Sequence, residues 1–136
     1  MVPLIFREQT SESLNDLLTG DLEVAVWWGT WTACAVMIRR LRRTSMLGKE
    51  SEQEARAALD GLAADWTEIE PADDLRLLAS LLSKEYPLRA ADALQLAAAL
   101  RWCEGDTTGA RFVCLDNRLR RAAQGEGFQV LPVEEE

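Results

Sequence analysis

Apolar positions along the chain follow two spacings, one typical of helices and one typical of short strands. One face of a predicted helix beginning near Ala72 carries leucines at helical spacing: Leu75, Leu78, Leu81 and Leu82. Residues 112–115 form an unbroken apolar run, which is typical of a strand buried on both sides. Together with the turn signals between them, such patterns predict helices over residues 10–20, 33–43, 49–64, 72–86, 88–103 and 117–124, and strands over residues 23–28, 66–70, 112–115 and 128–133.

Capping residues indicate where some of these elements begin and end. Thr30 or Thr32 can cap the helix that follows Gly29, and Pro87 ends the leucine-rich helix. Asp116 directly follows the strand at residues 112–115, so its carboxylate can cap the next helix. Asp116 therefore has a structural explanation that requires no functional site.

The order of these elements predicts the fold class. Helices that alternate with short apolar strands imply a parallel sheet with right-handed crossovers and helices on both faces, which is a three-layer α/β/α domain. The 136 residues suit one compact domain, and no repeat or linker divides them, so we expect a single domain over residues 1–136. Such folds place their sites at the carboxyl ends of strands, where Asp116 stands.

The residue inventory limits the chemistry that the chain can perform. The sequence contains no histidine, which excludes Ser-His-Asp and Cys-His catalysis and any His-ligated metal site. Its three cysteines, Cys34, Cys103 and Cys114, form no close pair and are expected to be reduced thiols. Catalysis by this chain must therefore depend on carboxylates.

Charge and hydropathy indicate the compartment of the protein and its possible contacts with nucleic acid and membranes. The formal net charge of −8 opposes contact with nucleic acid over the whole surface, so any RNA contact must be local. No apolar run approaches the length of about 20 residues that a membrane span requires. Residues 1–8 also lack the features of a secretory signal. We therefore expect a soluble, cytoplasmic protein without membrane contact.

Several segments resemble the PIN-domain family of metal-dependent ribonucleases, especially its VapC-type toxins. Residues 89–97, Arg-Ala-Ala-Asp-Ala-Leu-Gln-Leu-Ala, resemble the family helix that carries an acid in an Asp-Ala-x-x-x-Ala setting. Residues 112–116, followed by Arg118 and Leu119, resemble the family strand with a terminal Asp. Residues 28–35 resemble the strand-to-helix junction of VapC-like members, and residues 2–8 resemble the segment after the first family strand. The similarity covers nearly the whole chain.

The resemblance implies an Mg²⁺- or Mn²⁺-dependent RNA endonuclease that acts on single-stranded or transfer RNA. In this family four acids hold one or two metal ions, and Asp92 and Asp116 occupy two of the acidic positions. Both residues are therefore expected to be metal ligands and catalytic residues. Their oxygen donors suit these hard cations. VapC-like descent also implies a cognate antitoxin as partner, and we expect a homodimer.

Two departures from the family pattern weaken the expected site. Ala33 stands where the family has a glutamate, and the first family strand, with its acid, would lie before Met1. Loss of two anionic ligands is expected to reduce metal affinity and impair catalysis. Because the family places its first strand between the strands at residues 24–28 and 112–115, a gap is expected there. Residues 1–6, a strand donated by a partner chain, or residues encoded upstream can fill it.

Two other interpretations remain open. The chain can be a catalytically inactive PIN-fold module that binds an antitoxin, RNA or its own copy. It can also be an unrelated α/β regulatory domain, which predicts that Asp92 and Asp116 lie far apart.

Two groups of side chains have both a structural and an RNA-binding interpretation. A basic run can guide an RNA backbone or complement a helix dipole: Arg39, Arg40, Arg42 and Arg43. Trp27, Trp28 and Trp31 can stack on bases or pack in the core or a dimer interface. We favour the structural interpretation of both groups.

Overall fold

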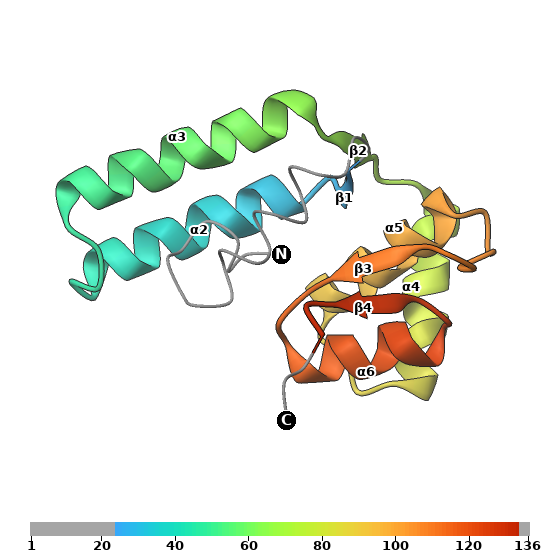
Figure 1. Ribbon diagram of the computed structural model, residues 1–136. Helices are drawn as coiled ribbons and strands as arrows, with labels where there is room; N and C mark the ends of the chain where they lie inside the picture. Colours follow the sequence, from blue (N-terminus) through green and yellow to red (C-terminus); the bar gives the residue numbers. More distant parts are fainter. Residues whose placement is uncertain (1–23, 134–136) are drawn as a thin grey trace. The chain divides into compact units, whose positions relative to one another are not determined.

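The computed structural model describes residues 24–133, which contain five helices and four short strands (Figure 1). In chain order these are β1 (Ala25–Trp27), α2 (Thr30–Arg43), α3 (Lys49–Asp65), β2 (Thr67–Ile69), α4 (Asp73–Glu85), α5 (Ala90–Trp102), β3 (Arg111–Val113), α6 (Asn117–Gly125) and β4 (Gln129–Leu131). This alternation confirms the mixed α/β class. The helix predicted over residues 10–20 and the segment 2–8 lie outside the described residues.

The described residues form two compact units. The first contains Val24 and residues 29–67, and the second contains residues 25–28 and 68–133. No helix within residues 24–133 combines the length and apolar character needed to cross a membrane. The expectation of one domain over the whole chain stays a prediction.

The first unit is a hairpin of α2 and α3, which lie side by side (Figure 1). Its core consists of small and aliphatic side chains from both helices: Cys34, Ala35, Ile38, Ala55 and Leu59. The predicted cap of α2 was wrong, because the N-cap residue is Gly29 and no side chain caps this helix. Thr30 instead begins the helix and is buried, so its side chain packs in the interior.

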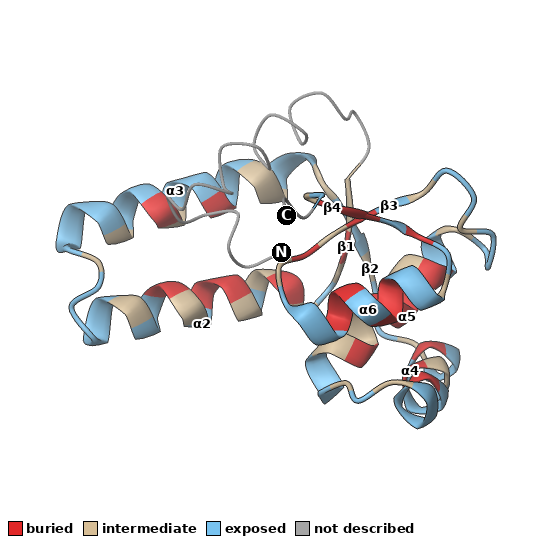
Figure 2. Cartoon of the chain, turned by 60° about the horizontal axis from the view of Figure 1, so that its bottom comes forward, coloured by how far each residue is buried: buried red, intermediate tan, exposed pale blue. Residues whose placement is uncertain are grey.

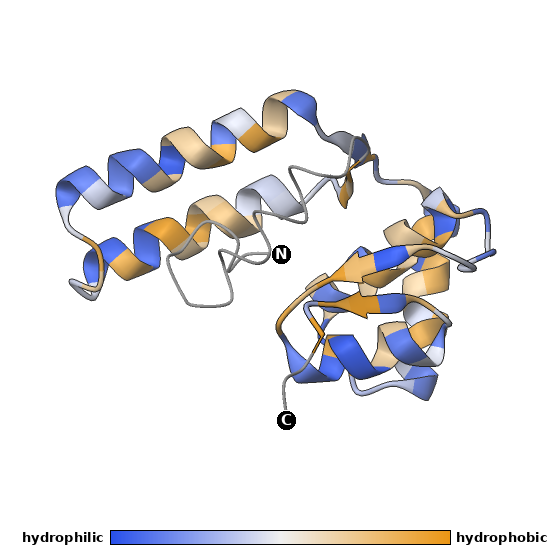
Figure 3. Ribbon diagram, viewed as in Figure 1, coloured by the Kyte–Doolittle hydropathy of each residue, from blue (hydrophilic) through white to orange (hydrophobic). Residues whose placement is uncertain are grey.

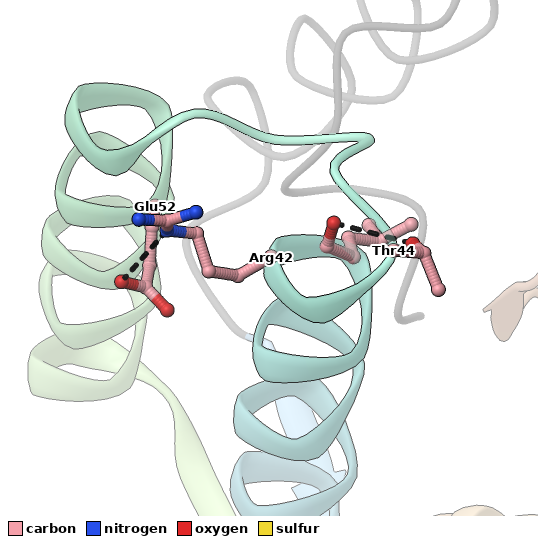
Figure 4. A network of polar contacts seen from close by, with 4 residues as sticks. Arg42, Thr44 and Glu52 are labelled. Atoms are coloured by element: carbon pink, nitrogen blue, oxygen red, sulfur yellow. Dashed lines mark hydrogen bonds and ion pairs between the residues drawn. The ribbon is translucent and has the colours of Figure 1, made fainter.

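Polar contacts join α2 to α3 and close the carboxyl end of α2. Figure 4 shows Arg42 of α2 directed toward Glu52 of α3, with 3.9 Å between Nε and Oε1. The Thr44 hydroxyl donates to the carbonyl oxygen of Arg40 at 3.1 Å, which satisfies one of the last carbonyls of the helix. Trp31 packs against the hairpin core and donates from Nε1 to Asp60 at 3.3 Å. Trp31 therefore has the packing role that we favoured.

The second unit contains β1, β3, β4 and all of β2 except Thr67, and the four strands form two separate pairs. Trp28 N–H at the end of β1 donates to the carbonyl oxygen of Ile69 in β2 at 3.0 Å, and β1 and β2 form a two-stranded sheet. In the other pair β3 runs parallel to β4, with Phe112 opposite Val130. Among the described strands no hydrogen-bonded ladder joins β1 to β3, where the first family strand is expected. A single central sheet and the three-layer arrangement therefore stay predictions.

Helix α5 is the central element of the second unit. It packs against α4, α6 and β1, and buried positions follow it along most of its length (Figure 2). The apolar residues of β3 and β4 complete the same core (Figure 3), in which the rings of Phe112 and Phe128 lie 5.5 Å apart. This core fixes the amino-terminal turn of α5 and the carboxyl end of β3, where the candidate acids are located.

Two details of the predicted apolar pattern were wrong. Leu81 is 48% exposed whereas Leu82 is buried, because successive residues of a helix are rotated by about 100°. The strand predicted over residues 112–115 ends at Val113, and Val113 and Leu115 are only partly buried. Strand pairing continues one residue farther, since Cys114 N–H donates to the carbonyl oxygen of Leu131 at 3.1 Å.

Candidate functional site

Asp116 lies between the end of β3 and the first turn of α6. Its backbone is extended, and its carboxylate Oδ1 accepts a 3.0 Å hydrogen bond from Leu119 N–H, so it is the N-cap of α6. The predicted capping role is thereby confirmed. The cap uses one lone pair of one carboxylate oxygen, and the side chain is exposed. The remaining oxygen lone pairs are chemically able to bind a ligand.

Asp92 lies in the first turn of α5 and is partly buried. Burial raises the pKa of the Asp92 carboxyl, the negative charge of Asp116 raises it further, and Arg89 opposes both effects. The two carboxylates are therefore within electrostatic range of each other, although 24 positions separate them in the sequence. The interpretation as an unrelated regulatory domain predicted them to be far apart.

Cys114 lies close enough to respond to the same two acids. Burial raises the pKa of its thiol to about 11; Arg120 opposes this shift, and the charges of Asp116 and Asp92 add to it. The thiol is consequently protonated at neutral pH and is a poor nucleophile. Cys34 is also a buried free thiol, as predicted, whereas Cys103 is only partly buried.

The acid pair has the chemistry of a partial site for a hard divalent cation. The two negative charges repel each other, and a bound cation would replace this repulsion with attraction. Among residues 24–133 no cluster of three or more His, Cys, Asp or Glu side chains is placed to hold a metal ion. The pair fits Mg²⁺ or Mn²⁺ in donor type but supplies only part of the roughly six oxygen ligands that such ions take.

Ala33 is part of α2, in the hairpin unit. Its methyl side chain has no oxygen to offer a metal ion. The position at which the family resemblance implies a third acid, besides Asp92 and Asp116, therefore offers no metal ligand from its side chain.

Arg120 is a residue of this region that the sequence did not single out. It is 5% exposed, and its guanidinium donates to the carbonyl oxygens of Cys114 at 2.8 Å and Pro132 at 2.6 Å. A signal was present, because Arg120 lies three residues before Ala123, on the apolar side of α6. A charged residue at such a position indicates a buried polar contact.

The basic and aromatic groups differ in their surroundings. All four arginines of the run, Arg39, Arg40, Arg42 and Arg43, are exposed on α2, and the last three lie in its last turn, where they complement the helix dipole. Trp27 packs against the core of the second unit, whereas Trp28 is 53% exposed. Of the three tryptophans, Trp28 therefore has the largest free surface for a partner.

Comparison with models of protein families and with curated proteins gives no match for this chain. The function must therefore be inferred from the acid pair and its surroundings. Within residues 24–133, the electrostatic interaction of Asp92 with Asp116, at the starts of two helices that pack together, is the feature with the clearest chemical meaning.

Proposed function

We propose that this chain is a VapC-like PIN-domain protein in which Asp92 and Asp116 hold one Mg²⁺ or Mn²⁺ ion for hydrolysis of an RNA phosphodiester. The observation that carries the proposal is that Asp92 in the first turn of α5 and Asp116 at the N-cap of α6 stand at the starts of two helices that pack together. The charge of Asp116 accordingly contributes to raising the pKa of Asp92. The resemblance of residues 89–97 and 112–116 to the family motifs supports it independently.

The surroundings of the two acids support binding of a cation. Asp116 is held by its bond from Leu119 N–H, so little side-chain freedom remains to be lost when a ligand binds. Asp92 is partly buried beside a second negative charge, which makes its ionised form unfavourable until a cation compensates it. A bound ion would supply an activated water molecule and neutralise charge on the phosphate.

The small number of acids sets the expected strength of the site. Two carboxylates leave most of the coordination to water or to RNA oxygens, so we expect a dissociation constant on the order of millimolar. Hydrolysis should accordingly be slow and should require high metal concentrations. As a VapC-like protein, the chain would act in the cytoplasm as a homodimer and bind a cognate antitoxin. Because the net charge of this chain is −8, the antitoxin surface that contacts it is expected to be basic.

A second candidate function is a catalytically silent PIN-fold module that binds an antitoxin, RNA or its own copy. Ala33 in place of a glutamate favours it, as does the lack of a third acid near the pair within residues 24–133. Such a module would retain the binding surface and lose the metal.

Calorimetric titration with Mn²⁺ tests the metal site. We expect one ion to bind the wild-type protein, and D92N and D116N to lose this binding. D106N is a matched control, because Asp106 is also an exposed acid that accepts a backbone hydrogen bond, from Thr108 N–H at 3.1 Å. If wild type binds no ion at millimolar Mn²⁺, the nuclease proposal is rejected.

Incubation with single-stranded and transfer RNA separates the two functions. Cleavage that requires Mn²⁺ and is lost in D92N and D116N supports the nuclease. RNA binding without cleavage, unchanged in both variants, supports the silent module.

A further inference from the structure

The buried guanidinium of Arg120 joins three elements. Arg120 lies in α6, Cys114 directly follows β3, and Pro132 directly follows β4. Nη1 donates to the Cys114 carbonyl and Nη2 to the Pro132 carbonyl. The planar guanidinium can donate in both directions at once, which a smaller or more flexible side chain cannot do. One side chain therefore connects the carboxyl ends of two parallel strands to the helix that follows β3.

Arg120 also fixes the chain on both sides of Asp116. Its side chain holds the carbonyl of Cys114, two residues before Asp116. Its backbone N–H donates to the carbonyl oxygen of Asp116 itself at 2.9 Å, and the preceding amide, Leu119 N–H, donates to the Asp116 carboxylate. The main chain and side chain of Asp116 are thus held by residues 119 and 120.

A buried arginine needs polar partners to offset the cost of its burial, and Arg120 has them in the carbonyls of Cys114 and Pro132. Transfer of a charged group into the interior carries a large desolvation cost, and apolar residues of similar volume often stabilise such sites as well or better. The α6 face around Arg120 is otherwise apolar, with Leu119, Ala122 and Ala123 buried. The specific result of the arginine is the alignment of two strand ends with the start of α6.

We propose that Arg120 is a positioning residue that, by bridging the ends of β3 and β4, holds the Asp116 carboxylate where it can share a cation with Asp92. This inference rests on the proposed metal site. The bridge itself involves only residues of the second unit and does not depend on the identity of the RNA.

Substitution of Arg120 separates positioning from a simple charge effect. R120M removes the bridge and one positive charge, and R121M removes the same charge from the neighbouring, exposed arginine of α6. If charge alone mattered, both variants would bind Mn²⁺ more tightly, because a positive charge near a cation site opposes binding. We expect R120M to bind at least about tenfold more weakly, which corresponds to about 1.4 kcal/mol, and R121M to bind as well as wild type.

R120K provides a graded variant that keeps the charge. A compact ammonium group cannot span both carbonyls in the manner of a planar guanidinium, so we expect an Mn²⁺ affinity between those of R120M and wild type. All variants are compared at a temperature at which circular dichroism shows them fully folded. Loss of folding in both R120M and R120K would overturn the proposal, because Arg120 would then be required for the fold itself.

Hydrogen exchange gives a readout that does not need the metal. In R120M we expect the Leu119 amide to exchange at least about tenfold faster, while the Ala97 amide in the middle of α5 keeps its wild-type rate. If wild type binds no Mn²⁺, the proposed function fails, and the Leu119 amide alone decides whether the bridge holds Asp116. Wild-type exchange at Leu119 in folded R120M overturns the inference, and so does faster exchange with unchanged Mn²⁺ affinity.

Discussion

The hydroxyl of Tyr86 donates a 2.7 Å hydrogen bond to Oε2 of Glu126. Tyr86 is the C-cap of α4 and Glu126 is the C-cap of α6, so the bond joins the carboxyl ends of two helices that are 40 residues apart in sequence. Thr107 adds a third segment through its hydroxyl, which donates to the Glu126 backbone carbonyl at 2.8 Å. Side-chain contacts therefore close this end of the second unit.

Removal of the Tyr86 hydroxyl should weaken the fold. A hydrogen bond to a charged group contributes up to a few kcal/mol when buried, so for this partly exposed pair we expect Y86F to lower the free energy of unfolding by about 1 kcal/mol. Urea denaturation at pH 7 measures the change. E126Q, which keeps an acceptor without the charge, should lose less, and equal stability of Y86F and wild type would contradict the expectation.

The same bond predicts a decrease in stability at alkaline pH. The hydrogen bond to Glu126 is the main cause that raises the pKa of Tyr86 from 10 to about 12. Because the folded pKa lies above the unfolded one, the contribution of Tyr86 is complete below pH 10 and is lost as pH rises toward 12. Wild type should therefore lose its advantage over Y86F across this range. A difference between the two proteins that stays constant to pH 12 would disprove the role of the bond.

Asp92 should destabilise the metal-free protein at neutral pH. Burial and the charge of Asp116 raise the pKa of Asp92, so the folded state binds this proton more tightly than the unfolded state. The ionised form therefore lowers stability above the folded pKa, and this effect fades as pH falls through that pKa. We expect D92N to be more stable than wild type at pH 7 and to lose this gain in acid, as measured by urea denaturation in a chelator.

Asp106 is the control of opposite sign. Its pKa is lowered, mainly by the backbone hydrogen bond from Thr108, so its ionised form favours the folded state. D106N should consequently give no gain at pH 7. A D92N protein that is less stable than wild type at this pH would mean that the Asp92 carboxylate is satisfied without a metal ion.

The core of the second unit depends on the apolar face of α5. Leu96 is completely buried, and its replacement by alanine should cost about 2–5 kcal/mol through lost burial and the cavity that remains. L77A removes the same atoms from a side chain that is 62% exposed and should change stability by no more than about 0.5 kcal/mol. Similar losses in both variants would mean that α4 buries Leu77 against a partner in solution.

The exposed arginines of α2 give a test of RNA contact. If the chain binds single-stranded RNA through Arg39, Arg40 and Arg43, the triple variant R39Q/R40Q/R43Q should make the negative slope of log affinity against log salt shallower by about 2. The triple lysine variant keeps all three charges and should keep the slope. An unchanged slope in the glutamine variant would assign these residues to the helix dipole alone.

Local signals in the sequence predicted many of the elements. The helix expected over residues 49–64 is α3, Lys49–Asp65, because a run rich in Glu, Ala and Leu favours a helix without help from distant residues. The capping role of Asp116 was also predictable, since a cap involves only residues three positions apart. Thr30 shows the limit of such reasoning, because burial of its side chain took precedence over capping.

Contacts between distant segments could not be derived from periodicity. The proximity of Asp92 and Asp116 was expected from the family resemblance alone, because no local spacing relates the start of α5 to the end of β3. The bond between Tyr86 and Glu126 and the bridge made by Arg120 join segments whose approach depends on packing of the whole unit. The separation of the strands into two pairs likewise depends on tertiary packing and not on strand propensity.

The central position of α5 determines the order in which parts of the second unit unfold locally. A two-stranded pair is at best marginally stable by itself, so β1–β2 and β3–β4 must gain their order from the apolar core around α5. Amide protons in the middle of α5 should therefore be the last of this unit to exchange with solvent, and those of the strands should exchange earlier. Asp92 lies in the first turn of this slowest-opening helix and Asp116 at a junction that opens sooner, so partial unfolding would separate the two acids before the middle of α5 is lost.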